Sequence, residues 1–146
     1  MPKFSRNATV DWQGNIMEGK GELKAGTGAF TMPVSFPRRI GDAQGTTSPE
    51  ELIAAAHATC YAMVIAGALG RNNASTTKTT VSCTVTADKS DAGIKIERSD
   101  LHVDVEGLKG MDAAAFDKMA KEAEGKCPVS AALRESREIT VTTAVK

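Results

Sequence analysis

The sequence predicts a single α+β domain, because strand-like and helix-like segments are grouped along the chain rather than alternating regularly. Short apolar-polar stretches fill residues 1–47, one long apolar helix follows, and further strands precede two shorter helices. The 146 residues are enough to bury a substantial core without disulfides. We therefore predict one domain over residues 1–146, without an internal repeat or an interdomain linker.

Residues 1–47 are predicted to form a small antiparallel meander. The stretches "ATVDWQG", "GKGELKAG" and "AFTMPVSFP" alternate apolar and polar residues and are broken by Gly and Pro. The next segment, "RRIGDAQGTT", is predicted to be a glycine-containing loop.

The segment "SPEELIAAAHATCYAMVIAGALG" predicts the long helix. Ser48 suits the N-cap, Pro49 the first helical position, and Glu51 completes a capping box, while Gly70 is the predicted stop. Residues 52–69 contain no Asp, Glu, Lys or Arg, which approaches the length of a membrane span. A membrane role is disfavoured because alanine drives insertion weakly and no basic or aromatic anchor precedes the run.

A helix that is apolar on all sides is more simply buried in protein. One chain of this size hardly covers all of it, so a second copy is the predicted cover. Small residues would let the second backbone come close: Ala54, Ala55, Ala56, Ala58, Ala62, Ala66 and Gly67. The sequence thus predicts a homodimer with the long helices near its centre.

Three strands, two helices and a closing strand are predicted after the long helix. The strands are "VSCTVTAD", "AGIKIERSD" and "LHVDVEG", all of which alternate. "DAAAFDKMAKEAEG" predicts a helix from an Asp112 cap to a Gly125 stop, and "CPVSAALRE" a short helix with Pro128 at its first position. "EITVTTAV" is predicted to be the last strand.

Composition excludes several classes of protein. Lys plus Arg and Asp plus Glu each number 18, so a broad cationic surface for nucleic acid is not expected. The three cysteines and the absence of a secretory signal pattern at the start predict a reducing, cytoplasmic location.

The three cysteines differ in their local settings. Cys83 alternates with valines on a strand and is predicted to be a buried, inert residue. Cys127 directly precedes Pro128, where free N–H groups at a helix start favour a thiolate, although a plain loop residue is equally compatible with the pattern. Cys60 lies in the middle of the long helix, where burial raises the pKa of a thiol unless a cation is supplied.

Three residues could supply that cation. His57 precedes Cys60 by one helical turn, although such a histidine is more often a hydrogen-bonded core or interface residue. Arg38 and Arg39 lie in the loop that leads into the helix, and an arginine there could hold a thiolate charged. The alternative for both arginines is a solvated loop pair.

Two other chemistries use the same residues. Cys60, Cys127 and His57 would give a zinc site three ligands, but no close ligand pair of the CxxC or HExxH kind supports it. A Cys-His hydrolase would need an independently oriented base and a third group, and neither is indicated. We expect neither a metal nor an organic cofactor.

The motifs "GTTSPEELIAAAHATCYAMV" and "GKCPVS" together resemble the OsmC/Ohr family of thiol-dependent hydroperoxide reductases, the OsmC branch in particular. The resemblance extends from "DWQG" near the start to "EITV" near the end. It implies an intertwined α+β homodimer with antiparallel sheets wrapped around central long helices. It also implies a peroxidase that reduces organic hydroperoxides, and hydrogen peroxide more weakly, at the expense of a dithiol such as a dihydrolipoyl protein.

The resemblance assigns roles to four residues. Cys60 matches the cysteine that is oxidised to a sulfenic acid, and Cys127 matches the one that resolves it to a disulfide. Glu50 matches the acidic residue of the family. Arg39 best matches its arginine, with Arg38 as a competitor, because "GTTSPEE" is one residue longer than the common "GTNPEE".

Helix geometry adds an expectation of its own. Glu50 and Cys60 are ten residues apart, roughly 15 Å along one helix, which is too far for both to contact one arginine. If two long helices pack antiparallel, the Glu50 end of one copy approaches Cys60 of the other. We therefore predict a composite site that takes Glu50, and with it Arg39, from the second copy. The main alternative function is a thiol redox sensor or binding protein that forms the same disulfide without turnover.

Overall fold

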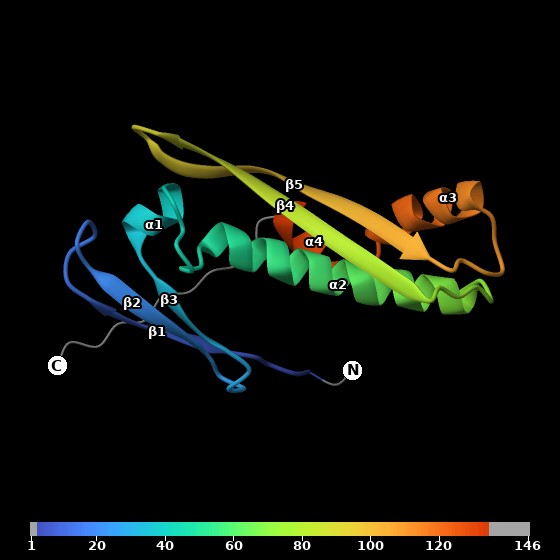
Figure 1. Ribbon diagram of the computed structural model, residues 1–146, viewed down its shortest axis with the longest axis horizontal. Coiled ribbons are helices and arrows are strands. Elements are labelled where there is room, and N and C mark those ends of the chain that lie inside the picture. Colours follow the sequence, from blue (N-terminus) through green and yellow to red (C-terminus); the bar gives the residue numbers. More distant parts are fainter. Residues whose placement is uncertain (1–2, 135–146) are drawn as a thin grey trace.

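The computed structural model describes residues 3–134 and confirms the α+β class. A three-stranded sheet comes first, followed by a one-turn helix, the long helix, a two-stranded hairpin and two short helices (Figure 1). The hairpin lies across the long helix, and the three-stranded sheet lies toward the beginning of that helix. The strand predicted at "EITVTTAV" is outside the described residues.

The N-terminal meander forms as predicted. Strands β1 (Ala8–Gln13), β2 (Lys20–Ala25) and β3 (Thr31–Val34) pair antiparallel in that order. At the β1–β2 turn, the side chain of Asn15 accepts hydrogen bonds from the backbone N–H groups of Met17 and Glu18. The sheet is therefore built from local contacts, and much of its apolar surface remains exposed.

Part of the predicted loop is a one-turn helix, α1 (Phe36–Ile40). Ser35 is extended and precedes it, and Pro37 lies in its first turn, where the fixed φ of proline suits a helix. The expectation of a loop was wrong for residues 38–40, because the glycines that favour a loop, Gly41 and Gly45, come only after Ile40. This turn places Arg38 and Arg39 beside the start of the long helix.

The long helix, α2 (Pro49–Arg71), begins where predicted. The Ser48 hydroxyl accepts a hydrogen bond from the Glu51 N–H at 3.1 Å. The Glu51 carboxylate accepts from the Thr47 hydroxyl at 2.6 Å, so this side chain secures the residue before the cap.

The predicted stop at Gly70 was wrong, because α2 continues to Arg71 and ends in a Schellman motif. Asn73 takes a positive φ of 52° and its N–H bonds the Gly70 carbonyl, while the Ala74 N–H bonds the Leu69 carbonyl. Asparagine tolerates this left-handed conformation, so Asn73 occupies the position after the C-cap that glycine usually holds.

Two of the predicted strands are a single strand. The hairpin consists of β4 (Lys78–Ser90) and β5 (Gly93–Glu106), paired antiparallel. The register shifts where Thr86 pairs with Arg98 and Ala87 with Ile96, which leaves Glu97 as a β-bulge. The bulge moves the inward positions of β5 from even to odd numbers, and this change of phase resembles a strand boundary in the sequence.

Helices α3 (Ala113–Glu124) and α4 (Pro128–Arg134) form as predicted, with Asp112 capping α3 through the Ala115 N–H. Both pack on α2. The Tyr61 hydroxyl donates to the Ala120 carbonyl and joins α2 to α3. The buried core takes residues from α2, from α3 and from the segments that follow them: Tyr61, Ile65, Ala68, Leu69, Ala74, Phe116, Ala120, Ala123 and Cys127.

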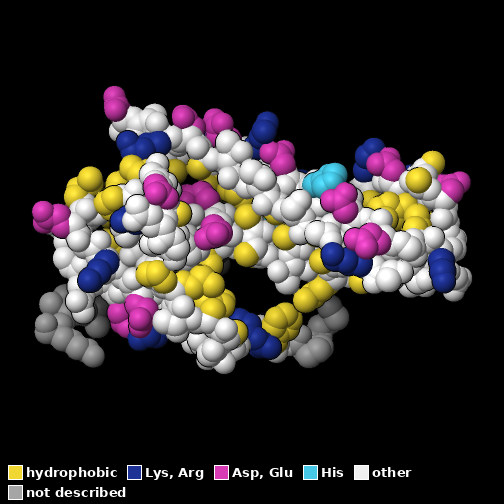
Figure 2. Space-filling model, in the orientation of Figure 1, with side chains coloured by type: hydrophobic (Ala, Val, Ile, Leu, Met, Phe, Trp, Pro, Cys, Tyr) yellow, Lys and Arg dark blue, Asp and Glu magenta, His cyan; other side chains and the backbone are white. Residues whose placement is uncertain are grey.

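One face of α2 is largely apolar and is exposed in the part of the chain that the structure describes. Its exposed residues follow helical spacing, namely Ala55, Ala56, Thr59, Met63, Ala66, Gly67 and Gly70. Met63 is 69% exposed. Hydrophobic side chains also surround a hollow between the meander and α2 (Figure 2). By length and composition α2 could cross a membrane, yet such a surface equally suits a protein partner, as predicted for a second copy.

Candidate active site

The two cysteines of the predicted site lie next to each other. Cys60 is in the fourth turn of α2, and Cys127 directly precedes α4. Their sulfur atoms are 3.2 Å apart, well beyond the roughly 2.05 Å of a disulfide bond, so both are free thiols. Cys127 is buried and Cys60 is half-buried. The pair is therefore reduced, sheltered and within reach of bond formation.

The surroundings of the two thiols separate their acidities. Burial raises the pKa of Cys127, but interactions with Ser130, with the Cys60 thiol and with the Val129 amide outweigh burial and lower the pKa below its ordinary value. Burial raises the pKa of Cys60, the Val129 amide partly opposes this, and the neighbouring Cys127 raises the pKa further. In the single chain Cys127 is thus the more acidic thiol, as its place at a helix start predicts.

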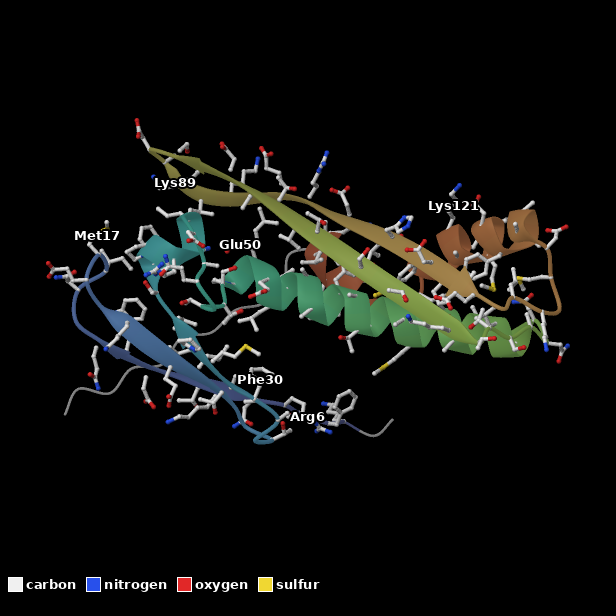
Figure 3. The ribbon with its side chains drawn as sticks, viewed as in Figure 1. Arg6, Met17, Phe30, Glu50, Lys89 and Lys121 are labelled. Atoms are coloured by element: carbon white, nitrogen blue, oxygen red, sulfur yellow. The ribbon has the colours of Figure 1, made fainter. Side chains whose placement is uncertain are left out.

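Arg39 and Glu50 form a bidentate ion pair at the junction of α1 and α2. Arg39 Nη2 lies 2.6 Å from Glu50 Oε1, and Arg39 Nε lies 3.2 and 3.1 Å from the two carboxylate oxygens. The hydrogen bond from Arg39 lowers the pKa of Glu50 and holds it charged. Figure 3 labels Glu50 in the first turn of α2, beside α1.

Arg38 is directed elsewhere, with its Nη1 donating to the Asp42 carbonyl at 3.3 Å. Of the two arginines that the sequence left open, Arg39 is the one paired with Glu50. The one-turn helix α1 accounts for this choice, because neighbouring residues of a helix point in different directions.

The ion pair and the thiol pair are separate clusters within one chain. Both Glu50 and Cys60 belong to α2, about 15 Å apart along its axis. Among the described residues, no arginine donates a hydrogen bond to Cys60. The described residues of the same chain therefore do not supply the cation that Cys60 needs. The guanidinium that could supply it, that of Arg39, is paired with Glu50 at the start of α2.

His57 occupies the core position that the sequence favoured over a ligand role. It is 4% exposed, and its Nδ1 and Nε2 lie 2.7 Å from the hydroxyls of Ser99 and Ser130 respectively. Burial lowers the pKa of His57, so the ring is neutral near pH 7 and does not act as the cation for Cys60. The same serines leave neither ring nitrogen open to a zinc ion.

Ser130, Ser99 and Glu124 were missed from the sequence. Ser130 could have been predicted from the sequence, because it stands three residues after Cys127 in "CPVS". This is the spacing between the N-cap and the third position of a helix. Ser99 lies on β5 beyond the bulge, and its position beside His57 depends on that bulge. Cys83 contacts Ser99 at 3.1 Å and is part of this polar cluster rather than of the thiol pair.

Comparison with known proteins gives consistent matches. The family described as OsmC-like protein matches residues 41–143. Peroxiredoxin OsmC of Escherichia coli (strain K12) is 37% identical over 137 residues, which cover 93% of each chain. Organic hydroperoxide resistance protein-like 2 of Staphylococcus epidermidis (strain ATCC 35984) is 28% identical and covers 75% of this chain and 77% of its own.

Solved structures agree in fold. The organic hydroperoxide resistance protein of Elizabethkingia anophelis superposes with a TM-score of 0.69 at 22% identity, covering 91% of this chain and 90% of its own. OhrB of Bacillus subtilis superposes with a TM-score of 0.66 at 24% identity, covering 88% and 90%. These matches confirm the family resemblance, and the chain belongs to the OsmC-like protein family.

Proposed function

We propose that this protein is a thiol-dependent peroxidase that reduces organic hydroperoxides, and hydrogen peroxide more weakly. The observation that carries the proposal is the 3.2 Å separation of the Cys60 and Cys127 sulfurs. Relatives named as a peroxiredoxin and as hydroperoxide resistance proteins support a peroxidase role. In the proposed cycle Cys60 attacks the peroxide and Cys127 resolves the product.

The cycle has three steps. The Cys60 thiolate attacks one peroxide oxygen, the O–O bond breaks, and the other oxygen leaves as an alkoxide that is protonated to the alcohol. The Cys127 thiolate then attacks the sulfur of the Cys60 sulfenic acid, a disulfide forms, and hydroxide leaves to become water. A dithiol reductant, such as a dihydrolipoyl protein, returns both cysteines to thiols by disulfide exchange. No step requires a metal or an organic cofactor.

In this proposal the first step uses a second copy of the chain. Burial raises the pKa of Cys60, and within residues 3–134 no arginine donates a hydrogen bond to its sulfur, so we assign the cation to the second copy. In a homodimer whose α2 helices pack antiparallel, the Arg39–Glu50 pair of one subunit would approach Cys60 of the other. Arg39 would then stabilise the thiolate and the leaving oxygen, while Glu50 orients the guanidinium. The exposed apolar face of α2 supports this packing.

The apolar surroundings of Arg39 support an organic substrate. A cavity of about 290 Å³ opens beside its side chain and is lined largely by hydrophobic groups. These groups come from the meander, α1 and the start of α2, and include Val10, Trp12, Leu23, Val34, Phe36 and Leu52. Such a wall would bind an alkyl or aryl group and offers little to hydrogen peroxide.

A cytoplasmic location fits this chemistry, because both cysteines must be reduced again after each cycle. The alternative is a redox sensor or binding protein that forms the same disulfide once. The two functions differ in whether peroxide consumption continues while a dithiol is supplied.

The test is turnover of cumene hydroperoxide and of hydrogen peroxide with excess dithiothreitol. We expect continued consumption by the parent and by Cys83→Ser, the matched cysteine control, with higher kcat/KM for cumene hydroperoxide. Cys60→Ser should be inactive, and Cys127→Ser should show one rapid oxidation followed by a much slower phase. Equal activity in Cys60→Ser, or a single oxidation event in the parent, would contradict the proposal.

A further inference from the structure

Four side chains from different elements form a hydrogen-bonded cluster between α2, α4 and the hairpin. His57 Nε2 lies 2.7 Å from the Ser130 hydroxyl on α4, and His57 Nδ1 lies 2.7 Å from the Ser99 hydroxyl on β5. The Ser99 hydroxyl also lies 3.1 Å from the Cys83 sulfur on β4. The proposed peroxidase cycle assigns a step to none of these four residues.

The same cluster borders a cavity. A space of about 260 Å³ is lined by His57, Ser99 and Ser130 together with residues of α2, α3, α4 and β5. His57 and Ser130 are buried, yet both form part of its wall, so a molecule in the cavity would lie against them. The volume is slightly below the roughly 300–1,000 Å³ of ligand pockets and suits a small ligand.

The hydrogen bonds can all run in one direction. A neutral imidazole has one N–H donor and one acceptor nitrogen. With the proton on Nδ1, His57 donates to Ser99, Ser99 can donate to Cys83, and Nε2 accepts from the Ser130 hydroxyl. Each contact then pairs one donor with one acceptor. This gives a hydroxyl, a base that can take its proton, and a third group that orients the base, which is the arrangement of a serine nucleophile.

One side of the cavity is apolar. Ile53 on α2, Ile96 on β5 and Leu133 on α4 contribute to the lining. Ile96 and Leu133 are each 41% exposed, so apolar groups are open to solvent at the cavity. Such groups would contact the hydrocarbon part of a ligand.

Charged groups complete the lining. Arg98, Arg134, Glu97 and Glu124 all border the cavity, and Arg134 pairs with Glu124. Arg98 holds the carboxylate of Asp100 through Nε at 2.8 Å. Because a guanidinium carries five N–H donors, Arg98 retains others for an oxygen that becomes negative during a reaction.

We propose that Ser130, His57 and Ser99 form an esterase site, which hydrolyses small carboxylic esters and uses neither Cys60 nor Cys127. The Ser130 oxygen attacks the carbonyl carbon, and its proton passes to His57 Nε2. The ester C–O bond breaks, and the alcohol leaves with that proton. Water then attacks the acyl-serine, the carboxylic acid leaves, and His57 returns a proton to Ser130. Ester and water give acid and alcohol, so no oxidant or reductant takes part.

The first test is hydrolysis of p-nitrophenyl acetate in a Cys60→Ala, Cys127→Ala background, because thiolates also react with activated esters. We expect saturable turnover. Ser130→Ala and His57→Phe should each lower kcat/KM at least about a hundredfold, since the first removes the nucleophile and the second its base. Ser99→Ala should cause a smaller loss, because it removes only the group that orients the ring.

Ser82→Ala and His102→Gln are the matched controls. Ser82 and His102 are also a serine and a histidine, and they lie opposite each other on the exposed face of the hairpin. His102 Nε2 lies 3.2 Å from the Asp104 carboxylate, so this histidine has a different partner. Both variants should hydrolyse the ester at the background protein's rate. A Ser130→Ala variant that does the same would overturn the proposal.

The second test changes no residue of the cluster and so survives a failure of those variants to fold. Phenylmethanesulfonyl fluoride reacts with an activated serine, forming a sulfonate ester at the oxygen while fluoride leaves. Peptide mapping of the folded background protein should locate the label on Ser130, and protein unfolded in urea beforehand should not carry it. Labelling of other residues alone, or equal labelling of Ser130 after unfolding, would overturn the proposal.

The tautomer of His57 provides a third measurement. Nitrogen-15 shifts of the imidazole distinguish the two neutral forms, and the proposal requires the proton on Nδ1. A ring protonated at Nε2 alone would donate to Ser130 instead of accepting from it, and that result would overturn the proposal. None of the three tests measures peroxide turnover, so their outcome is independent of the proposed peroxidase function.

Discussion

The Cys60 and Cys127 sulfur atoms lie 3.2 Å apart, although 67 residues separate them along the chain. Packing of α3 and α4 on α2 brings them together, and the Tyr61 hydroxyl fixes α3 through the Ala120 carbonyl. A disulfide would require the sulfurs to approach by only about 1 Å more. Resolution of an oxidised Cys60 can therefore occur without unfolding of either helix.

Mixed dimers test whether the site is composite. Arg39→Lys and Cys60→Ser should each be inactive as pure proteins, because lysine does not reproduce the bidentate contact with Glu50. If Arg39 serves the Cys60 of the other subunit, a mixed dimer contains one complete site. Mixing equal amounts, with subunit exchange, should restore roughly a quarter of the parent turnover, since half of the dimers are mixed and each has one of two sites.

Exchange must be verified, for example by native mass spectrometry, because unexchanged homodimers would also be inactive. No recovered turnover in verified mixed dimers would mean that Arg39 acts within its own chain or not at all.

Glu50→Gln should lower stability in a pH-dependent way. Arg39 holds the pKa of Glu50 below its unfolded value, so the stabilisation is fully present above the unfolded pKa, near 4.3, and is lost as pH falls through the folded pKa. We expect a loss of about 1–2 kcal/mol in the free energy of unfolding at pH 7, measured with urea, and a smaller loss below about pH 4.

Asp117→Asn is the control for Glu50→Gln, because it breaks an exposed ion pair with Lys121 on α3, which Figure 3 labels on the outer side of the helix. Exposed pairs of this spacing contribute about 0.5 kcal/mol or less, so little change is expected. A Glu50→Gln effect that is equal at both pH values would contradict the ion pair as its cause.

Ala66→Glu tests the predicted dimer face. Ala66 is exposed on the apolar side of α2, where a buried unpaired carboxylate would oppose packing of a second copy. Analytical ultracentrifugation should find the parent dimeric and the variant monomeric, with turnover reduced at least about tenfold because each composite site loses half of its residues.

Ala114→Glu is the matched control for Ala66→Glu, since it makes the same change at an exposed position in the first turn of α3. It should leave both mass and turnover unchanged. A monomeric parent protein with full turnover would contradict the dimer altogether.

Val10→Ser tests the apolar cavity beside Arg39. Removing this part of the wall should lower kcat/KM for cumene hydroperoxide about fivefold to tenfold, because a lost apolar contact is worth about 1 kcal/mol or slightly more. Hydrogen peroxide has no group to contact the wall, so its kcat/KM should stay the same. Asp11→Ser, on the opposite face of β1, should affect neither substrate. Parallel losses for both substrates would show that the cavity does not select.

Local sequence signals predicted most of the fold. The Ser48 and Asp112 caps, the alternation of the meander and the proline before α4 act within a few residues, and each element began where these signals placed it. The failures have nonlocal or irregular causes. The Glu97 bulge changes the phase of β5, and Asn73 adopts a conformation usually left to glycine.

The candidate site was predicted only in part for similar reasons. The cysteine motifs identified Cys60 and Cys127 through their resemblance to a family, whereas their proximity depends on how α2, α3 and α4 pack. The pairing of Arg39 with Glu50 depends on α1, a helix too short to produce a periodic signal. His57 and Ser130 meet across 73 residues, and no local pattern encodes that contact.

The most direct test of the account is the map of disulfides after oxidation of the reduced protein with one equivalent of cumene hydroperoxide. Non-reducing peptide mapping should find Cys60 joined to Cys127 within the same chain and Cys83 as a free thiol. Consumption of the peroxide without that link, with Cys60 still unmodified, would contradict the central claim.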